Sequence, residues 1–238
     1  MRILITNDDG VFSPALPSLV RWAKTLGDVT VIAPKVEQSG KSHAIDFQHP
    51  IEIKTVNIAT DLEAYSMDST PADCVRFGVL GLHKTYDLII SGVNRGFNLG
   101  SDLVYSGTVG AIFEGARLGI PGIAFSASPE GYIDATYHID ETWNQIEKMN
   151  LLSHNSWYNI NIPNERRDLL ITRQGGIFFT DRFVRTEGDI FVQEGEQATY
   201  DTSDLTLDID ATLSGHISAT PLLPTRTNID VFKKLNNI

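Results

Sequence analysis

The stretch ILITNDDG, residues 3–10, joins an apolar run to two adjacent aspartates and a glycine. Its first three residues are apolar without alternation, which is typical of a strand that is buried on both faces. Gly10 permits the sharp turn that would end such a strand. Because ligands bind beyond the carboxyl ends of parallel strands, the stretch predicts a strand over 2–6 that brings Asp8 and Asp9 to a binding edge.

The pattern around this stretch alternates between short apolar runs and amphipathic segments. We expect strands over 2–6, 29–33, 50–55, 62–66, 87–91 and 122–126, and helices over 14–26, 71–82, 108–118 and 135–149. Alternation of this kind is typical of a parallel sheet with helices on both faces. The sequence therefore predicts an α/β fold with a mostly parallel sheet flanked by helices.

The pattern changes after about residue 150. We expect strands over 157–162 and 168–172, a strand-like region over 176–212 and a short helix over 231–235. These features predict two units, a core over 1–150 and a β-rich C-terminal part over 151–238. Because its acidic strand-like segment also carries apolar residues, we interpret it as an arm that needs a partner, the alternative being a solvated hairpin on a monomer.

Composition excludes several classes of protein. The 238 residues carry 19 Lys and Arg against 30 Asp and Glu, so a basic face for general nucleic-acid binding is not expected. Most of the excess acid lies in residues 126–238, which hold 9 basic and 17 acidic residues. Cys74 is the sole cysteine, and no apolar run reaches the roughly 20 residues that span a bilayer. We therefore expect a cytoplasmic protein with no membrane partner.

Polar motifs follow three of the predicted strands and precede one helix. Asp8 and Asp9 repel one another, and a hard divalent cation would compensate them, although a solvated turn is the alternative. Ser39 follows the second strand, in a segment that lacks the first glycine of a P-loop. The stretch SGVNRGFNLG, residues 91–100, follows the strand over 87–91 and contains two asparagines. The stretch YSGTVG, residues 105–110, leads into a helix and is suited to bind an anion at the helix N-terminus, the alternative being ordinary helix capping. Together they predict metal-assisted phosphoryl transfer.

Five motifs together resemble the SurE survival-protein family of nucleotidases. They are ILITNDDG (3–10), AP (33–34) with QSGKS (38–42), TPADCV (70–75), SGVNRGFNLGSDLVYSGTVGA (91–111) and DATLSGHISATPL (210–222). The resemblance implies a Rossmann-like core with a β-rich C-terminal extension, and homodimers or homotetramers that exchange C-terminal elements. It also implies a divalent-metal-dependent phosphatase, a 5'-nucleotidase that hydrolyses nucleoside monophosphates to nucleoside and phosphate.

The resemblance also assigns roles to individual residues. It implies one divalent cation per subunit, Mg²⁺ or Mn²⁺ with Ca²⁺ as a substitute in crystals, held by Asp8, Asp9, Ser39 and Asn94. Asp8 and Asp9 are also the implied catalytic residues. The phosphate neighbourhood is implied at Asn98, Ser106, Gly107 and Thr108. Lys41 and His43 depart from the family pattern after QSG and leave the substrate preference open, and His43 is either a proton donor or a loop residue.

Three alternatives are weighed at this stage, two of them functions and one a mechanism. The first is a broader acid phosphatase or exopolyphosphatase, and the second is a nucleotide sensor without turnover, because a fold does not fix a function. The third is a phosphatase with an aspartate nucleophile after the first strand. In this chain the nucleophile position is Asn7, which cannot form an aspartyl phosphate.

Overall fold

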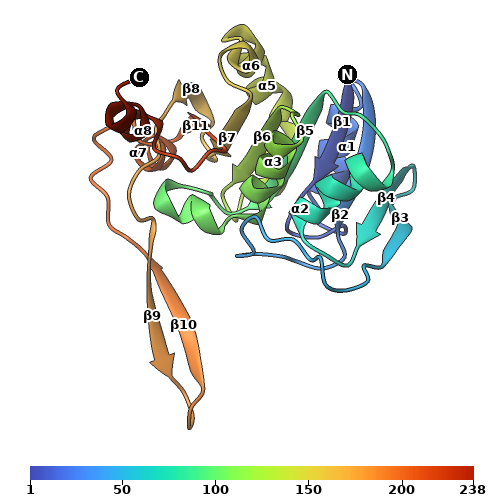
Figure 1. Ribbon diagram of the computed structural model, residues 1–238, viewed down its shortest axis with the longest axis horizontal. Coiled ribbons are helices and arrows are strands. Elements are labelled where there is room, and N and C mark those ends of the chain that lie inside the picture. Colours follow the sequence, from blue (N-terminus) through green and yellow to red (C-terminus); the bar gives the residue numbers. More distant parts are fainter.

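A nine-stranded sheet forms the centre of the computed structural model, which describes residues 1–238 (Figure 1). The strands of this sheet are β1 (Arg2–Thr6), β2 (Asp28–Pro34), β3 (Ile53–Ala59), β4 (Leu62–Met67), β5 (Leu88–Arg95), β6 (Gly122–Ala127), β7 (Trp157–Ile162), β8 (Arg167–Ile171) and β11 (His216–Pro221). They lie in the order β3-β4-β2-β1-β5-β6-β7-β11-β8. Only the β3–β4 and β7–β11 pairs are antiparallel, which confirms the predicted mostly parallel sheet.

Helices cover both faces of this sheet. The helices of the chain are α1 (Leu16–Ala23), α2 (Pro71–Arg76), α3 (Gly107–Arg117), α4 (Tyr132–Tyr137), α5 (Ile139–Lys148), α6 (Leu151–His154), α7 (Asp208–Leu213) and α8 (Ile229–Asn236), with a π-helical turn over Phe77–Gly81 and a 3₁₀ turn, η2, over Gly100–Tyr105. Helices α2 and α3 pack together on one face, whereas α1, α4 and α5 pack on the other. The predicted two-sided covering is therefore confirmed.

The first strand shows why two apolar layers form. Ile3 and Ile5 point into a cluster of 28 buried residues on the α1 face, whereas Leu4 points into a cluster of 14 on the α2 face. Successive side chains of a strand alternate between the two faces of a sheet. A strand with helices on both sides must therefore be apolar at every position, as ILI at residues 3–5 is.

Two predicted elements differ from the structure. The single helix expected over 135–149 is two helices, because His138 leaves helical geometry between α4 and α5 and its Nδ1 pairs with Glu141 Oε1 at 2.9 Å. The strand-like region over 176–212 ends in helix α7. Asp208 at its start is fully buried and accepts the Gly100 and Gly175 amides at 3.0 and 2.8 Å, and these partners are distant in sequence.

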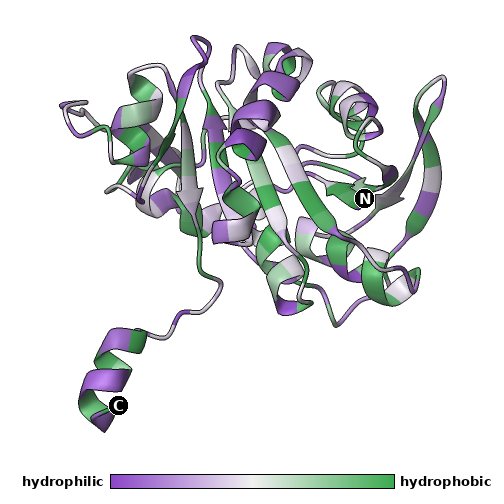
Figure 2. Ribbon diagram, turned by 90° about the horizontal axis from the view of Figure 1, so that it is seen from above, coloured by the Kyte–Doolittle hydropathy of each residue, from purple (hydrophilic) through white to green (hydrophobic).

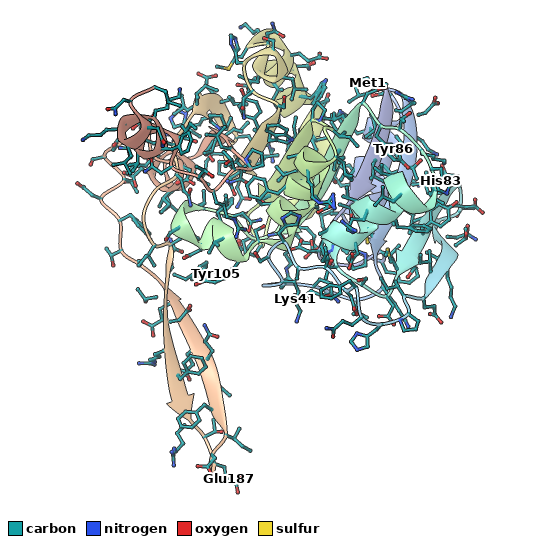
Figure 3. All side chains as sticks on the ribbon, viewed as in Figure 1. Met1, Lys41, His83, Tyr86, Tyr105 and Glu187 are labelled. Atoms are coloured by element: carbon teal, nitrogen blue, oxygen red, sulfur yellow. The ribbon has the colours of Figure 1, made fainter.

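Beyond residue 150 the chain extends the same sheet and then leaves it. Strands β7, β11 and β8 continue the sheet, so the division into units 1–150 and 151–238 stays a prediction. Strands β9 (Phe179–Arg185) and β10 (Phe191–Gln197) form a separate antiparallel hairpin that points away from the body, with Glu187 at its tip (Figures 1 and 3). Helix α8 also stands apart from the sheet (Figure 2) and buries none of its residues.

Candidate functional site

The two aspartates lie where β1 ends, beside the loop that follows β2. Asp8 is 4% exposed, and its backbone oxygen accepts the amide of Gln38 at 2.7 Å. Gly10 has a φ of +98°, and a Cβ there would lie 3.3 Å from the carbonyl carbon of Val36. The left-handed turn at Gly10 therefore holds the Asp8–Asp9 pair against the β2 loop.

The start of α3 closes the site on the other side of Asp8. The Thr108 hydroxyl donates to Asp8 Oδ1 at 2.6 Å. Ser106 caps the helix, since its Oγ accepts the Val109 amide at 3.1 Å. A Cβ at Gly107 would lie 3.2 Å from Asp8 Cβ and 3.3 Å from Asp8 Oδ2. Because Gly107 has no side chain, the N-terminus of α3, which is the positive end of its dipole, can lie close to the Asp8 carboxylate.

The other predicted metal ligands approach the pair from two further strands. Asp9 Oδ2 accepts the Arg95 amide at 3.2 Å, and this bond ties the pair to the end of β5. Asn94 precedes Arg95 on that strand, and its Nδ2 donates to the Gly96 carbonyl at 2.8 Å. Ser39 is exposed and donates to Glu37 Oε1 at 2.6 Å, and it lines one cavity together with Asp9. The three strand ends therefore converge as expected, although Ser39 and Asn94 bond to neighbours in their own loops.

Burial changes the acidity of both aspartates. Burial raises the pKa of Asp8, against the opposing effect of the Thr108 hydroxyl. Burial, followed by the charge of Asp8, raises the pKa of Asp9 to about 7. Two neighbouring carboxyl groups in a poorly solvated site cannot both ionise cheaply. In the absence of a cation this site therefore favours a proton on at least one of them.

The donor atoms fit a hard cation. The predicted ligands offer carboxylate, hydroxyl and amide oxygens, which Mg²⁺, Mn²⁺ and Ca²⁺ prefer. The neighbouring Asn7 is 1% exposed, and its Oδ1 has no hydrogen-bond partner. No group of three or more His, Cys, Asp or Glu side chains is arranged for a metal. A cation at this site would thus need hydroxyl, amide or water oxygens in addition to Asp8 and Asp9.

Asn98 is anchored by the sheet rather than held free for a ligand. Its Nδ2 donates to Ser126 Oγ at 2.8 Å, and its amide donates to Asn161 Oδ1 at 2.9 Å. Its carbonyl accepts the side-chain amides of Asn159 and Asn161 at 2.7 and 3.0 Å. These bonds fix the loop after β5 against β6 and β7. Of the polar atoms in the Asn98 side chain, only Oδ1 takes part in none of them.

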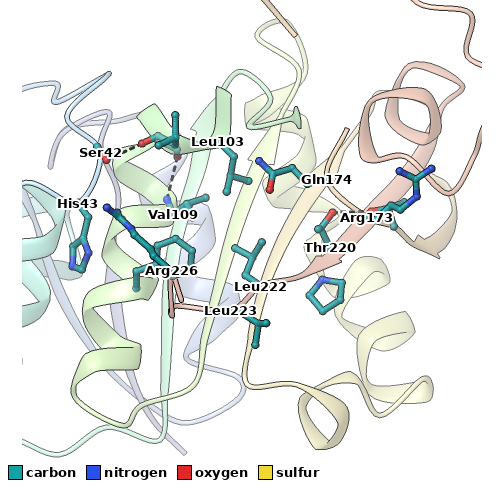
Figure 4. A pocket seen from close by; sticks show the side chains of 16 residues that line it. Ser42, His43, Leu103, Val109, Arg173, Gln174, Thr220, Leu222, Leu223 and Arg226 are labelled. Carbon is teal, nitrogen blue, oxygen red and sulfur yellow. Dashed lines mark hydrogen bonds between the residues drawn. The ribbon is translucent and has the colours of Figure 1, made fainter. Parts of the chain in front are cut away.

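His43 fixes the loop after β2 to α3. Its Nε2 lies 2.8 Å from Oε2 of the buried Glu114, whose Oε1 accepts from Arg76 at 2.9 Å. This contact gives His43 a structural partner in place of a free loop position. Lys41 is exposed and lies, like Tyr105, at the lower edge of the main body in Figure 3. His43 also borders a cavity of about 480 Å³ next to Ser106 (Figure 4).

Residues that sequence reasoning did not select also line the cavity at Asp9. Among them are Phe12, Ser13 and Tyr132. The first two share the loop of the Asp8–Asp9 pair, so their position next to it was a usable signal. Tyr132 starts α4 after β6, and only the neighbouring positions of β5 and β6 in the sheet bring it to the site.

The fold and site define an α/β protein with buried carboxylates and a helix N-terminus at the carboxyl edge of its sheet. The family model "Survival protein SurE" matches residues 3–181. Proteins named 5'-nucleotidase SurE are similar over nearly their whole length. The one from Paramagnetospirillum magneticum is 38% identical, covering 99% of this chain and 94% of its own, and the one from Caldanaerobacter subterraneus is 35% identical, covering 99% and 96%. This chain belongs to the SurE family.

A solved structure has the same fold. The crystal structure of the SurE protein from Aquifex aeolicus is similar with a TM-score of 0.79 and 34% identity, over 100% of this chain and 99% of that one. The fold expected from the resemblance is therefore confirmed. None of the helices in this chain combines the length and apolarity needed to cross a membrane.

Proposed function

We propose that this chain is a 5'-nucleotidase, a phosphoric monoester hydrolase that converts nucleoside monophosphates to nucleoside and orthophosphate. The names of relatives that align along almost the whole chain support this activity. The observation that carries it is the contact between Asp8 and the start of α3, with Thr108 Oγ1 at 2.6 Å from Asp8 Oδ1. This contact supports the proposal because acidic side chains lie next to a helix N-terminus, and a helix N-terminus can hold an anion.

One divalent cation, Mg²⁺ or Mn²⁺, fits the donor set of Asp8, Asp9, Ser39 and Asn94. A bound cation offsets the charge of the carboxylates and the phosphate and lowers the pKa of a coordinated water. The raised pKa values of both aspartates support this assignment, because a buried acidic pair lacks compensation without a cation.

The residues of the chain supply orientation and proton transfer. The amides at the start of α3, with Ser106 and Gly107, face the non-bridging phosphate oxygens. The Thr108 hydroxyl and amide both donate to Asp8, so Thr108 orients that carboxylate. Asp8 or Asp9 accepts a proton from the water that attacks phosphorus in line, and the P–O bond to the nucleoside breaks.

A phosphate-release assay tests the proposal. Purified protein is given a panel of nucleoside 5'- and 3'-monophosphates with Mg²⁺ or Mn²⁺, and again with excess chelator. We expect release from 5'-monophosphates that the chelator abolishes and that Asp8→Asn and Asp9→Asn each lower at least about 100-fold. Asp140→Asn, on the exposed surface of α5, is the matched control. Full activity with chelator would refute the cation, and no release from any monophosphate would favour a sensor.

We also propose that the protein is a cytoplasmic homo-oligomer. The support for the oligomer is the apolar surface on the two elements that stand away from the body, the β9–β10 hairpin and α8. Exposed apolar residues on the hairpin and α8 include Phe183, Phe191, Val192, Val231, Phe232 and Leu235. Apolar surface of this extent is typical of an interface. Light scattering that gives the mass of a single chain would contradict the oligomer.

A further inference from the structure

A cavity of about 530 Å³ opens directly beside the Asp8–Asp9 pair. Asp9 and Ser39 line it together with Phe12, Ser13, Arg95 and Tyr132, and the charged residues Lys35 and Glu37 also border it. The lining comes from the loop after β1, the loop after β2, the end of β5 and the start of α4. A substrate whose phosphate lies at Asp8 and the α3 start can therefore extend into this cavity without crossing the sheet.

Flat apolar surfaces border the cavity. Phe12 is 67% exposed and lines the cavity, so its ring is accessible to a bound ligand. Tyr132 is partly buried against the core, and Cζ of Arg95 lies 5.8 Å from its ring centroid. Aromatic rings and guanidinium planes are the groups on which nucleobases stack.

A buried hydroxyl in the same lining has no partner. Ser13 is 6% exposed, and its Oγ forms no hydrogen bond within the protein. Buried hydroxyl groups are nearly always paired, so an unpaired one beside a cavity indicates a partner from outside the chain. A sugar hydroxyl or the polar edge of a base supplies such a partner.

The cavity in Figure 4 is a weaker candidate for the same ligand. Its lining includes Ser106, Leu103, Phe113 and Leu222, and none of the four predicted metal ligands. A group bound there would contact the capping residue of α3 but not the Asp8–Asp9 pair. The 530 Å³ cavity alone combines contact with Asp9, stacking surfaces and an unpaired hydroxyl.

We propose that this cavity binds the nucleoside of the substrate, with the base against Phe12, Tyr132 and Arg95 and with Ser13 bonded to the sugar or the base edge. The inference rests on the proposed nucleotidase function and adds to it the residues that recognise the nucleoside. Because stacking accepts every base, the cavity selects for the presence of a base more than for its identity.

Two substrates separate this inference from the function on which it rests. AMP carries the nucleoside, whereas ribose 5-phosphate carries the same phosphoester without the base. The measured quantity is the ratio of kcat/KM for AMP to kcat/KM for ribose 5-phosphate. We expect Phe12→Ala and Tyr132→Ala each to lower this ratio roughly tenfold, mainly through KM for AMP. Tyr137→Ala, which removes a 67% exposed aromatic side chain from the same helix as Tyr132, leaves both substrates unchanged.

A second measurement covers the case in which Tyr132→Ala fails to fold. Adenosine, which has no phosphate, should inhibit ribose 5-phosphate hydrolysis competitively in the wild type and roughly tenfold more weakly in Phe12→Ala, where the substituted side chain is exposed. An unchanged AMP ratio or unchanged adenosine inhibition overturns the assignment of the cavity. A wild type that hydrolyses neither substrate overturns the proposed function itself.

Discussion

Replacing Asp9 with asparagine should stabilise the protein in the absence of metal while abolishing its activity. In the metal-free fold, burial and the neighbouring charge of Asp8 raise the pKa of Asp9 from 3.8 to about 7. The folded protein therefore keeps a proton on Asp9 over a pH range in which the unfolded chain has lost it. Stability falls as pH rises through this range and becomes level above it.

The size of the effect follows from the pKa difference. At about 1.4 kcal/mol for each pH unit, ionised Asp9 costs the metal-free fold about 4 kcal/mol as an upper limit. Asp9 is partly exposed, and solvent screening reduces this to about 2 kcal/mol. We expect Asp9→Asn and the wild type to be equally stable near about pH 4, and the variant to be more stable by about 2 kcal/mol near about pH 8.

Urea unfolding with excess chelator across this pH range measures the difference. Mg²⁺ or Mn²⁺ at about 100 times Kd should then stabilise the wild type by about 2.7 kcal/mol and leave Asp9→Asn almost unchanged. Asp140→Asn should follow the wild type throughout. Parallel pH profiles for the wild type and Asp9→Asn would show that the carboxyl is not destabilised by its surroundings, and the argument from burial would fail.

Three further substitutions test the packing around the site. Gly107→Ala places a Cβ 3.2 Å from Asp8 Cβ, so we expect at least about tenfold lower phosphate release with unchanged circular dichroism. Gly176→Ala is the control and should match the wild type, because a Cβ at Gly176 would meet no other atom within 4 Å. Thr108→Val removes the donor to the buried Asp8 carboxylate and should cost about 1–3 kcal/mol in urea unfolding, with Thr108→Ser restoring most of it. Glu114→Ala leaves Arg76 only its longer contact with Asp73, at 3.8 Å, and should cost up to about 3 kcal/mol at neutral pH. Burial raises the pKa of Glu114, but hydrogen bonds from His43 and Arg76 lower it by more, so its pKa in the folded protein lies below 4.5. The stability that ionised Glu114 contributes is therefore lost as pH falls through this folded-state pKa.

The sequence predicted the elements whose own side chains decide their structure. The run at residues 3–5 is apolar at every position, and that requirement of a strand covered on both faces gave β1 and the parallel sheet. Helix α7 was missed because its start depends on the Gly100 and Gly175 amides, which bond to buried Asp208 from distant parts of the chain. The alternating apolar residues before it gave a strand-like local signal instead.

The site divides in the same way. The sequence by itself determined which residues stand at the strand ends, since Asp8, Asp9 and Asn94 follow or end apolar runs whose carboxyl ends must share one edge. Only the tertiary structure decided which of them meet, because a hydrogen bond such as that from Thr108 to Asp8, across 100 positions, depends on how α3 packs on the sheet. The cavity lined by Phe12 and Tyr132 has the same origin. Local sequence sets side-chain chemistry, whereas the order of strands in the sheet sets the distances between side chains.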